Sequence, residues 1–196
     1  MNATSAVIAL TGLLALLGRA DAQGLSSLYT STAEKNCRVK DAPPDGSISI
    51  CPGKGGLIVV LTEADARQTA SVGRNPKAAD NEPAASQSFR PFNSTTNTVE
   101  WRIANGKPFA IIQRWHISDN EEQDKHGRPV GRNLLVVTRL PPGPVCHVAY
   151  IDARANPNPN ELARKVADEA ARDFQCGRDE VKIAGESGRA TELAKH

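Results

Sequence analysis

The sequence lacks the short motifs that most often identify a catalytic or cofactor site. None of its four cysteines stands in a Cys-x-x-Cys pair. The stretch 53–56 (GKGG) lacks the spacing of a phosphate-binding loop and precedes a strand pattern, whereas that loop follows a strand. Residues 185–188 (GESG) lie in a charged tail where no strand-to-helix turn is expected, so they are not a nucleophile elbow. No cofactor is therefore expected.

Long apolar runs and an excess of one charge are also absent. The apolar run at residues 6–18 is shorter than the roughly 20 residues that cross a bilayer. Lys and Arg number 24 against 22 Asp and Glu, spread along the chain, so nucleic acid is not an expected partner. The acidic segment 119–124 has no glycine where an EF-hand turn needs one, so no metal is expected there.

The N-terminus has the pattern of an export signal. The apolar run is followed by Ala20-Asp21-Ala22, small residues typical of cleavage before Gln23. The first five residues carry no Lys or Arg, and no cysteine follows the run at a lipoprotein-type position. We therefore expect a signal peptide at residues 1–22 and no transmembrane segment after its removal.

In an oxidising compartment, an even number of cysteines predicts structural disulfides. The segment 37–51 (CRVKDAPPDGSISIC) has a Pro-Pro-Asp-Gly centre and resembles a hairpin-like turn closed by a Cys37–Cys51 bridge. The other two cysteines, Cys146 and Cys176, are then left to pair with each other.

The spacing of the next elements supports the Cys146–Cys176 pair. A strand over 146–152 advances about 20 Å, and a helix over 159–175 returns about 24 Å. The cysteine after the helix should therefore arrive beside the cysteine at the strand start. With both pairs formed, no thiolate remains for catalysis or for zinc.

The remaining patterns predict an α+β fold. We expect an antiparallel, meandering sheet of five to seven strands with a C-terminal helix packed on one face. Expected strands lie at 57–62, 67–72, 98–118 (a hairpin), 133–140 and 145–152. Residues 73–97 and 119–132 have no period and are expected to be loops. A single domain is expected over 23–176, followed by a disordered tail over 177–196.

The helix at 159–175 has the clearest boundaries. Asn158 is expected to cap it, with Pro at its first position. The stripe Leu162, Val166, Ala170 and Phe174, flanked by alanines, is expected to be buried against the sheet. The charged side, which includes Arg164 and Asp168, is expected to face solvent.

The hairpin at 98–118 turns at Asn105-Gly106, and its register decides which side chains share a face. A three-residue loop, 104–106, would pair Trp101 with Phe109 and would collect the apolar residues on the odd face. The even face then carries four polar side chains: Glu100, Arg102, Arg114 and His116.

Those four residues are the candidate binding site. Such a cation-rich cluster suits a carboxylate or a sugar, although a plain solvent-facing sheet with cross-strand ion pairs explains the same residues. Direct contact between Glu100 and His116 is not expected in this register. His147, on a strand opposite Thr138, is expected to be a hydrogen-bonded core histidine.

Several segments together resemble a group of small exported alphaproteobacterial proteins of no known function. They are CPGKGG (51–56), VEWRI (99–103), KPFAIIQR (107–114), LLVVTRL (134–140), CHVAYIDA (146–153) and NELARKVADEAARDFQC (160–176). The resemblance spans roughly residues 28–178. It implies a periplasmic setting in a Gram-negative cell and the two-bridge fold. It carries over no functional residues.

The leading hypothesis is a non-enzymatic periplasmic protein that binds an envelope protein or glycan. One alternative is a hydrolase of envelope polymers that uses His116 or His147 with a carboxylate such as Glu100 or Asp152. Another is a structural partner in a larger complex, contacted through residues 73–97. The sequence leaves the oligomeric state open.

Overall fold

The structure, a computed structural model, describes residues 24–42 and 46–195; the expected signal peptide lies outside them. The larger of two sheets has the order β1-β6-β7-β8-β9-β10 and is antiparallel except for the short β10, which runs parallel to β9. Its strands are β1 (Leu25–Ser31), β6 (Asn93–Ala104), β7 (Lys107–Gln123), β8 (Pro129–Arg139), β9 (His147–Asp152) and β10 (Lys182–Ile183).

The smaller sheet is a four-stranded antiparallel meander. It consists of β2 (Arg38–Ala42), β3 (Gly46–Pro52), β4 (Ile58–Ala64) and β5 (Arg67–Gly73). The helical elements are η1 (Glu34–Asn36), α1 (Pro76–Asp80), η2 (Pro83–Ser86), α2 (Pro159–Ala170) and α3 (Arg189–Ala194). The predicted fold class, antiparallel strands with a C-terminal helix, is confirmed. The strands form two sheets, however, where one was expected.

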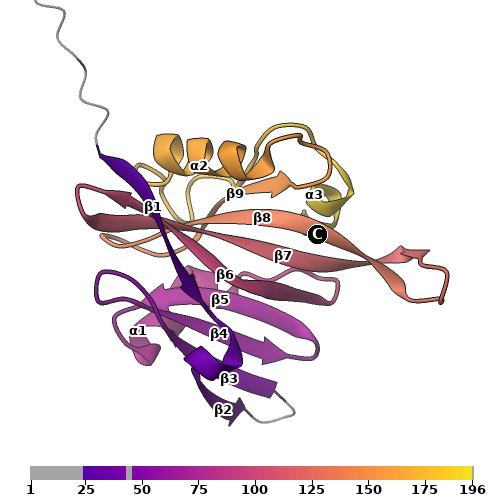
Figure 1. Cartoon of the computed structure of the whole chain (residues 1–196), viewed down its shortest axis with the longest axis horizontal. Coiled ribbons are helices and arrows are strands. Elements are labelled where there is room, and N and C mark those ends of the chain that lie inside the picture. The colour runs from indigo at the N-terminus through magenta and orange to yellow at the C-terminus, as the bar shows by residue number, and fades with distance from the viewer. Residues whose placement is uncertain (1–23, 43–45, 196) are drawn as a thin grey trace, which may run out of the picture.

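The six-stranded sheet lies between the four-stranded sheet and helix α2, as Figure 1 shows. On one face, Trp101 and Trp115 pack with Val59 and Val72 of the smaller sheet. The other face packs beneath α2 and buries a second apolar cluster. The central residues of β8, 134–137, are apolar on both faces, as expected for a strand that is covered on both sides.

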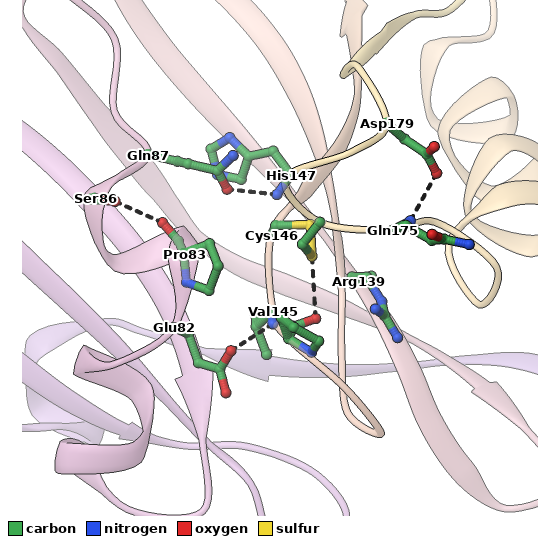
Figure 2. The surroundings of a disulfide bond; sticks show 12 residues. Glu82, Pro83, Ser86, Gln87, Arg139, Val145, Cys146, His147, Gln175 and Asp179 are labelled. Carbon is green, nitrogen blue, oxygen red and sulfur yellow. Dashed lines mark hydrogen bonds between the residues drawn. A yellow bond between two sulfur atoms is a disulfide. The ribbon is translucent and has the colours of Figure 1, made fainter.

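Both predicted disulfides are present. Cys37 and Cys51 join the start of β2 to β3, with Cα atoms 4.3 Å apart. Cys146 and Cys176 join the start of β9 to the segment after α2, with Cα atoms 5.9 Å apart, as drawn in Figure 2. The expected return of the helix along the strand therefore holds.

The predicted turn of the β6–β7 hairpin is wrong. Asn105 and Gly106 form a two-residue loop, both with positive φ, and Ala104 pairs with Lys107. Ile103 then pairs with Pro108 and Arg102 with Ala110, so Phe109 is an extra, bulged residue. Trp101 consequently pairs with Ile111. The bulge corrects the register beyond the turn, so the odd-numbered apolar residues other than Phe109 share one core. Phe109 packs in the cluster beneath α2.

Residues 73–97 were expected to be a long loop and instead form α1, η2 and the start of β6. Figure 2 shows how this segment is fixed to the start of β9. Glu82 accepts a hydrogen bond from the Val145 amide (2.7 Å), and Gln87 accepts one from the His147 amide (2.7 Å). The segment is therefore part of the domain.

Helix α2 is shorter than predicted, and the row of side chains that it buries against the sheet differs from the predicted one. It ends at Ala170, and Asn158 occupies the cap position without a side-chain cap bond. The most buried side chains are Ala163, Ala167 and Ala171, whereas Leu162 and Val166 are only partly buried. These small side chains let the helix backbone approach the sheet closely.

The expected loop at 119–132 and the expected disordered tail at 177–196 are also corrected. Strands β7 and β8 extend through most of the first segment as a projecting hairpin (Figure 1). The tail contains β10 and α3 as far as residue 195. Arg189 of α3 bonds buried Asp119 of β7 at 2.8 Å through both Nε and Nη2. A paired carboxylate on the sheet thus holds the tail.

Candidate functional site

Most of the polar face of the β6–β7 hairpin lies beneath α2, where a plain solvent-facing sheet was the alternative; of its four predicted residues, His116 is the exposed one. Arg102 makes a bidentate ion pair with Asp168 of the helix: Nε–Oδ1 is 2.9 Å and Nη2–Oδ2 is 2.7 Å. One turn earlier on the helix, Arg164 Nε bonds Glu100 Oε1 at 2.6 Å. Glu100 and Arg102 are both buried, each 7 % exposed.

A serine of the edge strand links these two ion pairs. Ser27 Oγ donates a hydrogen bond to Glu100 and accepts one from Arg102 Nη1 at 2.6 Å. Tyr29, also on β1, accepts a bond from Arg164 Nη2 at 3.3 Å. Three elements, β1, β6 and α2, therefore share one hydrogen-bonded network. The hydrogen bond that Arg164 makes with Glu100 raises the pKa of Arg164, so this guanidinium stays charged.

Next to this network is a groove of about 450 Å³, within the range of small-ligand sites. Its floor is apolar and comes from Ile112 and Leu135. Polar groups form its walls: Tyr29, Thr96, Thr98, Glu100, Arg114, Asn160 and Arg164. The groove thus offers hydroxyls, a carboxylate and two guanidinium groups around an apolar floor.

Arg114 is the charged group of the groove without a carboxylate partner in the described part of the chain. Its Nη2 bonds the amide oxygen of Asn160 at 3.1 Å, and its side chain is partly exposed. The Glu100–Arg164 pair is neutral overall, so Arg114 gives the groove a net positive charge. Its donors remain available to a ligand oxygen.

Two of the four predicted residues therefore line the groove, Glu100 and Arg114, and Arg102 supports it from beside Glu100. His116 is separate from them. It pairs with Ser94 and Asn133 in the sheet, is exposed, and lines another pocket with Phe92 and Gly131. The twist of the long β7 strand turns the His116 side chain away from that of Arg114, two positions earlier on the same strand.

His147 is a core residue, as predicted. It lies opposite Thr138 and is 1 % exposed. Its Nδ1 is 2.9 Å from the Tyr150 hydroxyl, while Phe89 and Trp115 pack around the ring. Burial lowers the pKa of His147 to about 3, so the ring is neutral.

Neither His116 nor His147 is hydrogen-bonded to a carboxylate within the described ranges 24–42 and 46–195. The same ranges contain no group of three or more His, Cys, Asp and Glu that could hold a metal ion. None of the described helices combines the length and apolar character needed to cross a membrane.

Four residues of this site, on α2 and β1, were not predicted from the sequence: Tyr29, Asn160, Arg164 and Asp168. A signal for three of them was present. Asn160, Arg164 and Asp168 recur every four residues, so they form one row along α2. Within that row, Arg164 and Asp168 have charges opposite to those of Glu100 and Arg102, two positions apart on β6. Such complementarity would have predicted a helix lying over that strand.

Comparison with known proteins finds no match among protein-family models, curated proteins or solved structures.

Proposed function

We propose that this chain is an exported, non-enzymatic binding module of the Gram-negative cell envelope, and that it binds a glycan in the groove beneath α2. The observation that carries the proposal is the groove itself. Arg114 and the Glu100–Arg164 pair surround an apolar floor, with the hydroxyls of Tyr29 and Thr98 beside them.

The chemistry of the groove suits a polyhydroxylated ligand. Sugar hydroxyls both donate and accept hydrogen bonds, so they match a wall that offers a carboxylate, guanidinium groups and hydroxyls together. The apolar side chains of Ile112 and Leu135 can contact the C–H face of a sugar ring. The free donors of Arg114 favour a sugar that carries a carboxylate.

The two alternatives have less support. The hydrolase alternative depends on His116 or His147 lying near a carboxylate. His147 is instead neutral and sealed among aromatic rings, and His116 is in another pocket. A structural partner that contacts residues 73–97 would have to bind a segment whose Glu82 and Gln87 are already bonded to the start of β9.

Export is part of the proposal. The two disulfides are consistent with an oxidising compartment, and with a periplasmic location of the mature chain. Expression of the full chain in a Gram-negative host, followed by N-terminal sequencing of the periplasmic product, tests this. We expect a mature N-terminus at Gln23; an uncleaved cytoplasmic product would contradict export.

The binding proposal is tested on a microarray of bacterial envelope glycans and by calorimetry with the best glycan. We expect binding of acidic glycans, with Kd raised about tenfold by Arg114→Ala, the loss of one charge-assisted hydrogen bond. Arg74→Ala removes an exposed arginine outside the groove and should leave Kd unchanged. Binding to no glycan, or equal loss in both variants, would refute the proposal.

A further inference from the structure

A second pocket lies at the other end of the face that α2 covers. Its volume is about 470 Å³, and the three charged residues that line it, Lys107, Arg139 and Arg172, are all basic. No acidic side chain lines it. Its walls are otherwise largely apolar, with Phe109 and Leu140 among them.

The arginine at the end of β8 is the unusual group in this pocket. Arg139 alternates with Leu135 and Val137 on the helix-covered face and is 8 % exposed. Its backbone amide bonds the Cys146 carbonyl at 3.0 Å, so it lies beside the Cys146–Cys176 disulfide (Figure 2). In this buried row, the position after Leu135 and Val137 is thus occupied by a charged side chain, where an apolar one would be expected.

The guanidinium of Arg139 has few partners. Nη2 donates to the Pro142 carbonyl at 2.6 Å, and the buried Nε has no hydrogen-bond partner. No carboxylate lies within ion-pair distance of Arg139 in the described part of the chain. A buried cation is normally paired, and an orphaned buried donor calls for an explanation.

The surrounding backbone leaves room for this side chain. Gly143 has φ of +89°, and a Cβ there would lie 3.2 Å from both Nη atoms of Arg139. On the opposite wall, the β-bulge turns Phe109 onto the helix-covered face, where the Arg172 guanidinium lies 5.3 Å from the centre of its ring. The turn and the bulge together form the walls.

We infer that this pocket is a second ligand site, distinct from the groove, and that it binds a small organic carboxylate with an apolar body. The carboxylate supplies the counter-ion that Arg139 lacks, through the paired oxygens that a guanidinium fork matches. Lys107, exposed at the hairpin turn, adds positive charge at the rim. The apolar body of the ligand lies against Phe109, Leu140 and the Pro141-Pro142 segment.

The test uses the mature chain purified from the periplasm. Benzoate is the probe, and its binding is measured by calorimetry and by NMR of the backbone amides. Benzoate should bind saturably and shift the amide resonances of Phe109 and Leu140. Benzamide, which has the same shape without the charge, should bind at least tenfold more weakly. Inorganic phosphate, which has the charge without the apolar body, should also bind at least tenfold more weakly.

Variants locate the site. Arg139→Gln should raise the Kd for benzoate at least tenfold. Lys107→Gln, at an exposed position where folding is not at risk, should raise it two- to fivefold. Arg114→Ala should leave benzoate binding unchanged, and Arg139→Gln should leave glycan binding unchanged, so failure of one site is distinguishable from failure of the other.

Three results would overturn the inference. The first is that benzoate does not bind saturably. The second is that benzamide or phosphate binds as tightly as benzoate. The third is that Lys107→Gln leaves the Kd for benzoate unchanged and the amide shifts map away from Phe109 and Leu140.

Discussion

Arg102 of β6 and Asp168 of α2 form a two-bond ion pair (2.9 and 2.7 Å), and the neighbouring pair, Glu100–Arg164, has the opposite polarity. A slip of the helix by one turn would bring Arg102 to Arg164, which places two like charges together. The buried helix face is made of alanines, whose uniform small side chains specify position weakly. The two reversed ion pairs therefore fix where the helix lies along the sheet.

Removing Arg102 should destabilise the protein strongly. Arg102→Ala leaves Asp168 and Ser27 without their buried partner, and we expect a loss of about 3 kcal/mol of unfolding free energy in urea titrations. The Arg102→Met, Asp168→Leu double variant, which leaves no unpaired charge, should lose less than the single variant. A loss below about 1 kcal/mol in Arg102→Ala would show that this pair contributes as little as an exposed one.

The Cys146–Cys176 disulfide, which follows α2, should stabilise the folded protein by restricting the unfolded chain. Cys146 and Cys176 are 30 positions apart, and closing a loop of that length is worth about 3.5 kcal/mol through the unfolded chain. The double replacement by serine should lower the unfolding free energy by about this amount. The Cys37–Cys51 pair, 14 positions apart, should be worth about 3 kcal/mol and is the matched comparison. A loss below 1 kcal/mol would contradict the estimate.

Features that one local constraint decides could be predicted from the sequence. Proline and glycine punctuation separates β2 from β3, although the turn residues 43–45 lie outside the described residues. The return of the helix along the preceding strand brings Cys176 to Cys146. The position of His147 opposite Thr138 follows from the Pro141–Pro144 turn. Each of these features depends on one continuous stretch of the chain and not on contacts between distant elements.

Features that depend on contacts between distant elements were missed. The charged side of α2 was predicted to face solvent, because its complementary charges, Glu100 and Arg102, lie 64 and 66 positions from Arg164 and Asp168 in the sequence. The bulge at Phe109 is hidden because the two-residue turn and the bulge together preserve the same alternation that a three-residue loop gives. The tail was missed because its anchor, Asp119, lies 70 positions from Arg189.

Buried His147 should make stability fall with acid. Its folded pKa of about 3 is below the usual 6.5, so the unfolded state takes up a proton first as pH falls. Stability is full above pH 6.5 and should fall by about 2 kcal/mol between pH 7 and pH 5. His147→Leu should lose this slope in urea titrations, and His126→Gln, at an exposed position, should keep it. An unchanged slope in His147→Leu would contradict the assignment.

Asp119 should make the stability of the protein depend on pH in a lower range than His147 does. Hydrogen bonds from Arg189 hold the pKa of Asp119 at about 2, below the usual 3.8. Its contribution is present above pH 3.8 and should be lost as pH falls through 2. Asp119→Asn should remove the contribution at every pH and should speed amide hydrogen exchange in α3 at pH 7. Unchanged exchange there would mean that Arg189 does not hold the tail.

Arg139 gives the last prediction, because a residue retained for a ligand need not stabilise the empty protein. Its guanidinium is buried without a carboxylate partner, and only the bond to Pro142 would be lost on replacement. Arg139→Met keeps the apolar stem and removes the buried charge. We expect its unfolding free energy to equal or exceed that of the parent by up to about 1 kcal/mol. Benzoate should raise the Tm of the parent protein and leave that of Arg139→Met unchanged. A loss of more than 2 kcal/mol in the absence of ligand would assign Arg139 a structural role instead.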